Sequence, residues 1–186
     1  AVLALAGALA IYYAVACAVF FGLFIATPSA KWSFSAMLFA SLWTLAELAR
    51  GVFFTGFPWG AGGYAHTDGA LAGYVPWLGA YGIGAVAAWM AFMLTGLIRV
   101  SGRSRWLAGL TLVGVLALGQ AAQWAGPTFT RSSGTQSVAL LQGNIAQNEK
   151  FRPGTGIADA LKWYGEPLKS SPASLVVAPE TAIPLL

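Results

Sequence analysis

The sequence predicts a membrane α-helical bundle of about four spans, followed by the beginning of an external α/β domain. The composition is the first observation: 58% of the residues are hydrophobic and only 9% are charged, whereas soluble domains carry about 25% charged residues. Long uncharged runs up to about residue 126 are the second. The third is a change after that point to strand and helix patterns separated by polar turns.

Four apolar segments are expected to cross the bilayer, at about residues 1–27, 32–54, 71–98 and 106–124. A run of about 20 apolar residues is long enough for one span. The first 30 residues carry no charge, and no basic region precedes the apolar run as it would in a signal peptide. We therefore expect a spanning helix here, and a chain that begins inside a larger membrane domain.

Positive residues predict which side of the membrane each connection occupies. Arg99, Arg103 and Arg105 fall between the third and fourth spans and form the densest positive cluster of the chain. The positive-inside rule places this connection in the cytoplasm. Counting back through the spans places Lys31 in the cytoplasm as well, and residues 55–68 on the external side. The fourth span then leads the rest of the chain to the external side.

Two charges lie near the end of the second span. Glu47 and Arg50 are three residues apart and share one helical face, so they are expected to pair. Charges inside a membrane are costly and often functional. A structural ion pair near the interface and a functional role both remain open.

Residues 55–68 form a segment whose glycine and proline content interrupts any helix. Its aromatic side chains are typical of the membrane interface: Phe57, Trp59 and Tyr64. We expect a loop that lies on the membrane surface or dips into it. His66 and Asp68 are too few for a metal site by themselves, so a solvated loop is the favoured interpretation.

Charge and cysteine content exclude several classes of protein. The net charge of +4 is too thinly distributed to indicate a nucleic-acid partner. The single cysteine, Cys17, lies in an uncharged run, which excludes a disulfide framework and a cysteine-rich metal site. We expect Cys17 to be structural, because an apolar environment disfavours the thiolate.

The chain divides into a transmembrane domain (1–126), a polar linker (127–136) and an α/β part (137–186). Strands are expected at 138–141 and 175–178, with a helix between them at about 156–169. Strand, helix and strand at this spacing indicate a βαβ-type unit. Because some fifty residues are too few for a stable core, we expect the sheet to be completed by sequence outside this chain.

Glu180 is the candidate catalytic residue. It follows the second strand directly after Pro179, which cannot continue a sheet. Partial burial of a carboxylate at the end of a strand would raise its pKa and make it a usable proton acceptor. The alternative is a structural role, in which Glu180 pairs with an arginine or caps a helix.

Three stretches carry a resemblance to a known family: Trp43-Thr-Leu-Ala-Glu-Leu-Ala-Arg-Gly51 continuing to Thr55-Gly-Phe-Pro-Trp59, Leu141-Gln-Gly-Asn-Ile-Ala-Gln147, and Ala178-Pro-Glu-Thr-Ala-Ile-Pro184. In these stretches the chain resembles the bacterial apolipoprotein N-acyltransferases. Their order and approximate spacing are those of the family, which joins a multi-span membrane domain to an external nitrilase-like domain, an α-β-β-α sandwich. The resemblance implies that residues 137–186 are the N-terminal part of that domain.

The family resemblance also implies a reaction. An acyl chain moves from a membrane phospholipid to the N-terminal amine of a diacylglyceryl-cysteine on an apolipoprotein, through a thioester on an enzyme cysteine. The triad is Glu, Lys and Cys, and Glu180 matches its glutamate by motif. In these proteins the Lys and Cys follow the glutamate strand, whereas this chain ends at Leu186 and Cys17 lies in a span. We therefore expect a truncated chain that is inactive by itself.

Further expectations come with the resemblance. Phe151 stands in the loop after the Gln-Gly motif, where members often have Trp, and keeps an aromatic face for substrate binding. The partners are a phospholipid donor, a diacylated apolipoprotein acceptor and the bilayer, and no cofactor or metal is expected. The location is the bacterial inner membrane, with the nitrilase-like domain on the periplasmic face.

Two other functions remain open. A membrane-tethered amidase of the nitrilase type would use the same glutamate but needs fewer spans. A non-enzymatic scaffold or transporter would leave Glu47, Arg50 and Glu180 structural. Transporters usually show broken helices and internal repeats near mid-membrane, and the spans here show no repeat.

Overall fold

The computed structural model describes residues 2–126, 130–150, 152, 154–180 and 182. The chain divides into two compact units, Ala1–Phe129 and Thr130–Leu186. Each unit is described by itself.

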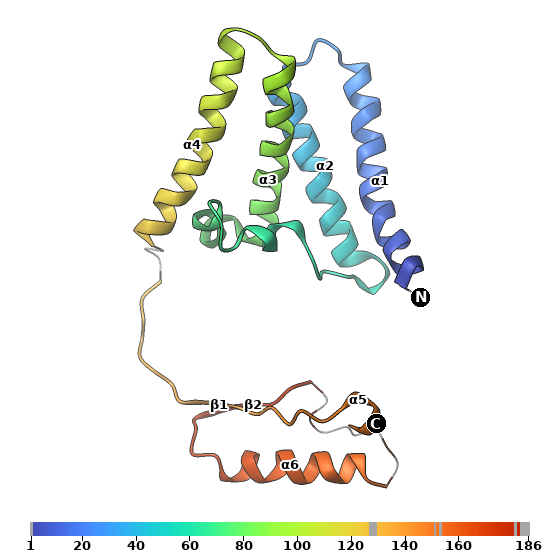
Figure 1. Cartoon of the computed structure of the whole chain (residues 1–186), viewed down its shortest axis with the longest axis vertical. Coiled ribbons are helices and arrows are strands. Elements are labelled where there is room, and N and C mark those ends of the chain that lie inside the picture. Colours follow the sequence, from blue (N-terminus) through green and yellow to red (C-terminus); the bar gives the residue numbers. More distant parts are fainter. Residues whose placement is uncertain (1, 127–129, 151, 153, 181, 183–186) are drawn as a thin grey trace. The chain divides into compact units, whose positions relative to one another are not determined.

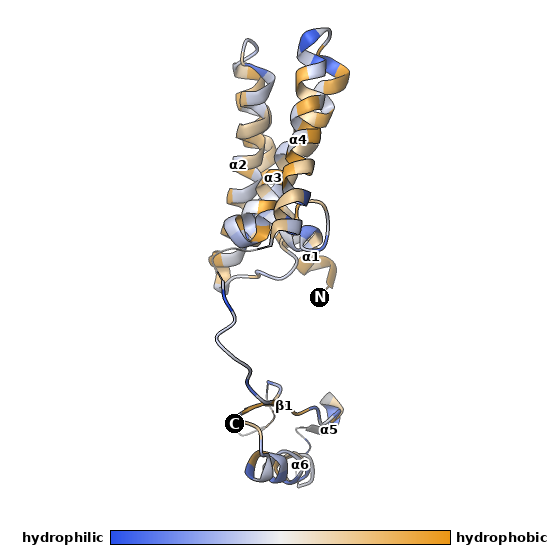
Figure 2. Cartoon of the chain, turned by 90° about the vertical axis from the view of Figure 1, so that its left-hand side faces the viewer, coloured by the Kyte–Doolittle hydropathy of each residue, from blue (hydrophilic) through white to orange (hydrophobic). Residues whose placement is uncertain are grey.

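The first unit is built from four long helices, α1 (Val2–Ala26), α2 (Trp32–Val52), α3 (Val75–Arg99) and α4 (Arg103–Ala125) (Figure 1). All four are long and apolar enough to cross a membrane, which agrees with the four spans expected from the sequence. Each helix packs against the next one along the chain. Figure 2 shows hydrophobic residues along the helices and hydrophilic ones at the turn between α3 and α4.

Aromatic rings and small residues hold the first three helices together. The ring of Phe92 on α3 lies 5.2 Å from the ring of Phe20 on α1. The same ring lies 4.9 Å from that of Trp32 and 5.5 Å from that of Phe39, both on α2. Trp32 packs directly over Gly96, where an added Cβ would collide with the indole.

The fourth helix is fastened to the start of the third. A short 3-10 helix, η3 (Ala72–Tyr74), precedes α3, and the Tyr74 hydroxyl donates a hydrogen bond to the Val115 carbonyl on α4 over 2.7 Å. Gly73 lies against the Gly119 carbonyl so closely that no Cβ fits between them. The first turn of α3 is set off by Gly79, whose φ of 66° only glycine adopts readily.

The segment between α2 and α3 is irregular, as its glycine and proline content predicts. Besides η3 it contains two more 3-10 helices, η1 (Phe53–Thr55) and η2 (Gly62–His66), and it lies at one end of the bundle (Figure 1). η2 packs against α3. The segment therefore forms a covering layer over the ends of α2 and α3.

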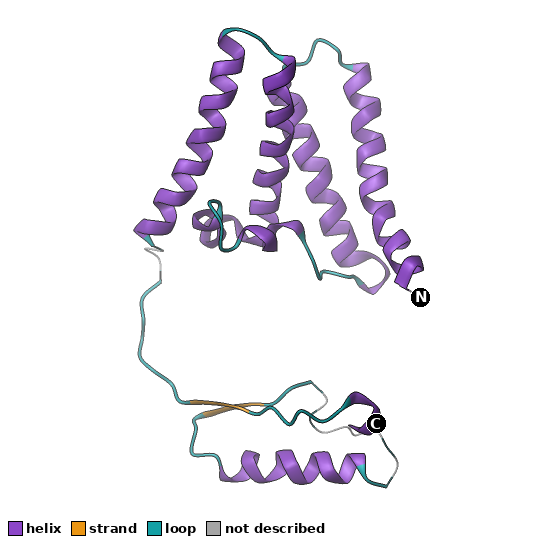
Figure 3. Ribbon diagram, viewed as in Figure 1, coloured by secondary structure: helices purple, strands orange, loops and turns teal. Residues whose placement is uncertain are grey.

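The second unit contains a strand, a short helix, a longer helix and a second strand: β1 (Val138–Leu140), α5 (Gln147–Lys150), α6 (Gly156–Ser170) and β2 (Leu175–Val177) (Figure 3). β1 and β2 pair in parallel, with Val138 opposite Leu175 and Leu140 opposite Val177. Both strands and α6 match the elements expected from the sequence to within one residue. A small core forms where Ala160 and Tyr164 of α6 pack against Leu141, Ala178 and Ala182.

Candidate functional site

The candidate catalytic edge lies where β1 and β2 end. The strands are parallel and in register, so the residues after Leu140 and those after Val177 leave the sheet at the same edge. Glu180 is three residues beyond the end of β2. Ligand and catalytic groups of α/β folds sit at this carboxyl edge.

The loop that follows β1 is held by helix α6. The Gly143 N–H donates a hydrogen bond to the Tyr164 hydroxyl over 3.1 Å. A Cβ on Gly143 would come within 2.6 Å of that oxygen, so a larger residue at this position would displace the Tyr164 side chain. The next residue, Asn144, has a φ of 49°, and its Oδ1 accepts a hydrogen bond from Gln142 over 2.9 Å. The Gln-Gly-Asn turn therefore has a defined shape at the same edge as Glu180.

Glu180 is solvent-exposed. The partial burial that would favour this carboxylate as a proton acceptor is not observed among the described residues. The neighbouring residue that reaches the core is Ala182. Phe151, the candidate substrate-binding residue, lies outside the described residues.

A second polar site lies at the end of α2, inside the membrane unit. Glu47 is 1% exposed and Arg50 is 4% exposed, although charged residues are almost never fully buried unless they are paired. The prediction that they form an ion pair is wrong. In the part of the chain that the structure describes, no nitrogen of Arg50 lies within 4.0 Å of a carboxylate oxygen of Glu47. Each side chain instead holds a different part of the loop after α2.

Arg50 binds the loop through two carbonyls. Its Nη1 donates hydrogen bonds to the carbonyl oxygens of Phe57 over 2.6 Å and of Trp59 over 2.8 Å. The Phe57 N–H returns a hydrogen bond to the Arg50 carbonyl over 2.8 Å. Hydrogen bonds from an ionised donor are about twice as strong as neutral ones, so this clamp fixes the Phe-Pro-Trp turn against the helix end.

Glu47 binds the loop further along. Its Oε1 accepts a hydrogen bond from the Gly62 N–H over 2.7 Å, and the Tyr13 hydroxyl of α1 donates to the same oxygen over 3.4 Å. Neighbouring Gly63 lies so close to the Ala80 carbonyl that no side chain fits. The carboxylate thus joins α1, α2 and η2, while a glycine seats η2 on α3.

Backbone strain and exposed rings mark the clamped loop. Phe54 and Thr55 have φ values of 55° and 72°, which cost of order 1–3 kcal/mol each and persist only where surrounding contacts enforce them. The rings of Phe54, Trp59 and Tyr64 are 93%, 77% and 61% exposed. The loop therefore has a rigid backbone with aromatic side chains turned outward, as expected of a segment at a membrane interface.

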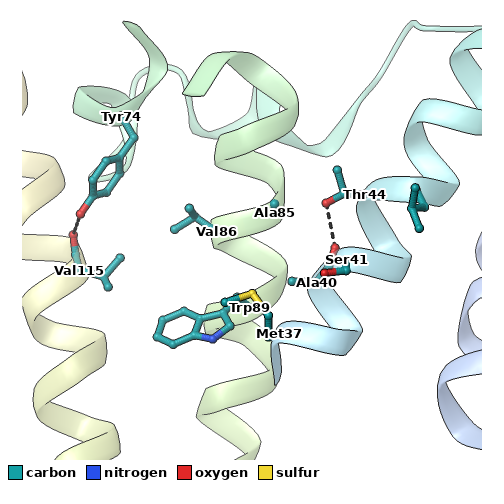
Figure 4. Close-up of a pocket in the computed structure, with 10 residues that line it drawn as sticks. Met37, Ala40, Ser41, Thr44, Tyr74, Ala85, Val86, Trp89 and Val115 are labelled. Atoms are coloured by element: carbon teal, nitrogen blue, oxygen red, sulfur yellow. Dashed lines mark hydrogen bonds between the residues drawn. The ribbon is translucent and has the colours of Figure 1, made fainter. Parts of the chain in front are cut away.

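An apolar pocket of about 680 Å³ lies among α2, α3 and α4 (Figure 4). Met37, Val86 and Trp89 form its walls. The hydroxyls of Thr44 and Tyr74 on its wall are bonded to the backbone carbonyls of Ala40 and Val115. The lining is mostly apolar, so this pocket suits an apolar occupant.

Within the described part of the chain, no group of three or more His, Cys, Asp or Glu side chains could hold a metal ion. Cys17 lies on α1 and is exposed on the helix surface.

Comparison with known proteins identifies the family. Residues 1–93 match the family described as "Apolipoprotein N-acyltransferase N-terminal domain". The whole chain is 50% identical over 194 aligned residues to the apolipoprotein N-acyltransferase of Verminephrobacter eiseniae and covers 35% of it. The chain belongs to the apolipoprotein N-acyltransferase family. It is therefore related to enzymes that are acyltransferases, as its motifs predicted.

Other apolipoprotein N-acyltransferases match over most of the chain. That of Ralstonia nicotianae is 47% identical over 155 residues, which is 82% of this chain and 28% of the relative. That of Nitrosomonas europaea is 40% identical over 162 residues, 84% of this chain and 31% of the relative. The chain thus spans about a third of the length of these relatives.

In this member of the apolipoprotein N-acyltransferase family, sequence reasoning found both charged residues of the buried site but not their role. The available signal was the order of the residues: a Glu and an Arg on one helical face, followed within a few positions by a Gly- and Pro-rich turn. Such a turn cannot satisfy its own carbonyls and amides, so nearby charged side chains are candidates to bind them.

Proposed function

We propose that the protein carrying this chain is an N-acyltransferase that moves an acyl chain from a phospholipid to the N-terminal amine of a diacylglyceryl-cysteine in apolipoproteins. The observation that carries the proposal is the 50% identity over the entire chain to a protein named apolipoprotein N-acyltransferase. The motif around Glu180 at the carboxyl edge of β1 and β2 supports it.

Glu180 is proposed as the general base. It takes the proton of a cysteine thiol, and the thiolate attacks the ester carbonyl of the phospholipid. The ester C–O bond breaks, the lysophospholipid leaves with a proton, and a thioester forms. In the second step Glu180 accepts a proton from the incoming amine, the C–S bond breaks, and the products are an amide and the free thiol.

The nucleophile of this reaction is not among the 186 residues. The single cysteine of the chain, Cys17, lies in α1 within the membrane unit. The activity is therefore proposed for the whole protein, and the chain by itself is expected to be inactive. We propose that the triad lysine and cysteine lie in the part of the whole protein that is outside these residues, since this chain covers 35% of the Verminephrobacter eiseniae relative.

The membrane unit supports a lipid substrate and an inner-membrane location. Both reactants of the proposed reaction are anchored in lipid, so a soluble enzyme would not reach them. Arg99, Arg103 and Arg105 at the α3–α4 turn favour a cytoplasmic location for that turn. The second unit follows α4 in the chain and would then lie on the periplasmic side.

The experiment is a chimera in which residues 1–186 replace the matching part of the Verminephrobacter eiseniae relative. Purified chimera is incubated with phospholipid vesicles and a synthetic diacylated lipopeptide, and the product mass is measured. The proposal expects one added acyl chain on the N-terminal amine. Release of ammonia from simple amides without acyl transfer would instead show an amidase and contradict the proposal.

A further inference from the structure

We propose that the groove between α1 and α2 binds a membrane phospholipid, with its phosphate on the Arg50 guanidinium and one acyl chain along the groove. The proposal concerns a resident lipid of the membrane unit and does not depend on the acyl-transfer reaction.

The guanidinium of Arg50 has unused donors. Its Nη1 is occupied by the carbonyls of Phe57 and Trp59, whereas Nε and Nη2 are buried and find no hydrogen-bond partner in the described part of the chain. Buried polar atoms almost always have a partner, so two orphan donors on one side chain indicate a missing group. Nε–H and an Nη2–H point from the same edge of the planar guanidinium, which is the geometry that binds two oxygens of one phosphate.

Glu47 makes no hydrogen bond to this edge among the described residues. Its Oε1 is used by Gly62 and Tyr13. Its Oε2 lies on the α3 side, where a Cβ on Gly84 would be 3.4 Å from it. Glu47 is also not among the residues that line the groove. An arginine that is 4% exposed and has no ion-pair partner within the described ranges favours an anion beside it.

The groove that Arg50 lines is shaped for a hydrocarbon chain. It has a volume of about 870 Å³, within the range of about 300–1,000 Å³ typical of ligand sites. Its walls are mainly apolar side chains of α1 and α2, among them Leu5, Ala8, Val15 and Leu45. Along α1 it extends from Leu5 to Val19, which is about 21 Å at the helical rise per residue.

The position of Arg50 fits a lipid headgroup. The groove is somewhat longer than one leaflet of a hydrocarbon core about 30 Å thick. Arg50 is in the last turn of α2, two residues before Val52. The positive residues of the α3–α4 turn predict that this end of α2 faces outward. A phospholipid could therefore place its phosphate beside Arg50 at the outer interface. Its acyl chain would then extend inward along the groove.

The test uses this chain in detergent micelles and native mass spectrometry. The probes are dioleoylphosphatidylglycerol and dioleoylglycerol, which share their acyl chains and differ in the phosphate headgroup. The proposal expects at least a tenfold preference for the phospholipid, and expects Arg50→Met to abolish that preference. Equal retention of the two lipids by the unaltered chain would overturn the proposal without reference to any variant.

A groove-filling pair of variants tests the position of the acyl chain. Ala8 lines the groove, whereas Ala10 is exposed and does not. Ala8→Trp leaves the loop contacts of Arg50 intact and should lower phospholipid occupancy at least fivefold, while Ala10→Trp should leave it unchanged. Equal occupancy in the two variants would contradict the site. A lipid-free dimer of the unaltered chain would show that a second copy fills the groove, and would also overturn the proposal.

Discussion

Glu47 and Arg50 lie one helical turn apart on α2, both nearly inaccessible to water, and bind two different points of the following loop instead of each other. Arg50 holds the carbonyls of Phe57 and Trp59, and Glu47 holds the amide of Gly62. The backbone between these points is thereby fixed at both ends. The aromatic rings of the loop can face the membrane interface while its backbone stays in place.

Arg50→Lys should loosen the loop. Lysine keeps the positive charge but replaces the planar guanidinium with a compact ammonium group, which does not reproduce the pair of carbonyl contacts. A hydrogen bond to a charged group contributes about 1.5–3 kcal/mol, so the free energy of unfolding should fall by about that amount. Hydrogen exchange of the 56–62 amides should become faster. Arg103→Lys, at an exposed arginine of the α3–α4 turn, is the matched control and should change neither value.

Gly63→Ala should separate η2 from α3. A Cβ at this position would collide with the Ala80 carbonyl, which belongs to a helix and cannot move alone. Overpacking of this kind costs about 1–3 kcal/mol. The thermal unfolding midpoint of the chain in micelles should fall. Gly69→Ala is the control, because nothing lies within 4 Å of its added Cβ; equal effects of the two substitutions would show that the contact is not tight.

The orientation of the bundle can be tested with cysteine labelling in a Cys17→Ser background. Ser104 lies at the start of α4 and Ser133 follows its other end, and both are exposed. A membrane-impermeant maleimide applied to spheroplasts should label Ser133→Cys and leave Ser104→Cys unlabelled until the membrane is opened. The reverse pattern would overturn the assignment of the α3–α4 turn to the cytoplasm.

The helices were predictable because their signal is local. Each of the four runs is long and nearly free of charge, so composition alone indicates a span. β1, α6 and β2 were predictable for a similar reason. The spacing of their apolar residues and the turn residues between them are both local features of the sequence.

The sequence makes the following turn a candidate partner of the charged residues but does not identify the atoms that bind them. A spacing of three residues shows that Glu47 and Arg50 share a face of α2, but not which groups reach that face. The carbonyls of Phe57 and Trp59 compete for Arg50 and bind it, because a turn broken by Pro58 and shaped by Gly56 brings them back over the helix end. The exposure of Glu180 likewise depends on the elements that lie around it in space. The short strand before Glu180 does not indicate which elements these are.

The most direct test of the account is the role of Glu180 in forming a thioester. In the chimera with the Verminephrobacter eiseniae relative, the enzyme is incubated with phospholipid alone, and the acyl-enzyme is measured by intact mass with and without hydroxylamine. The unaltered chimera should gain a hydroxylamine-sensitive acyl group, Glu180→Gln should lose it at least a hundredfold, and Glu166→Gln, an exposed control on α6, should retain it. A thioester that forms at the normal rate in Glu180→Gln would contradict the assignment of Glu180 as the base.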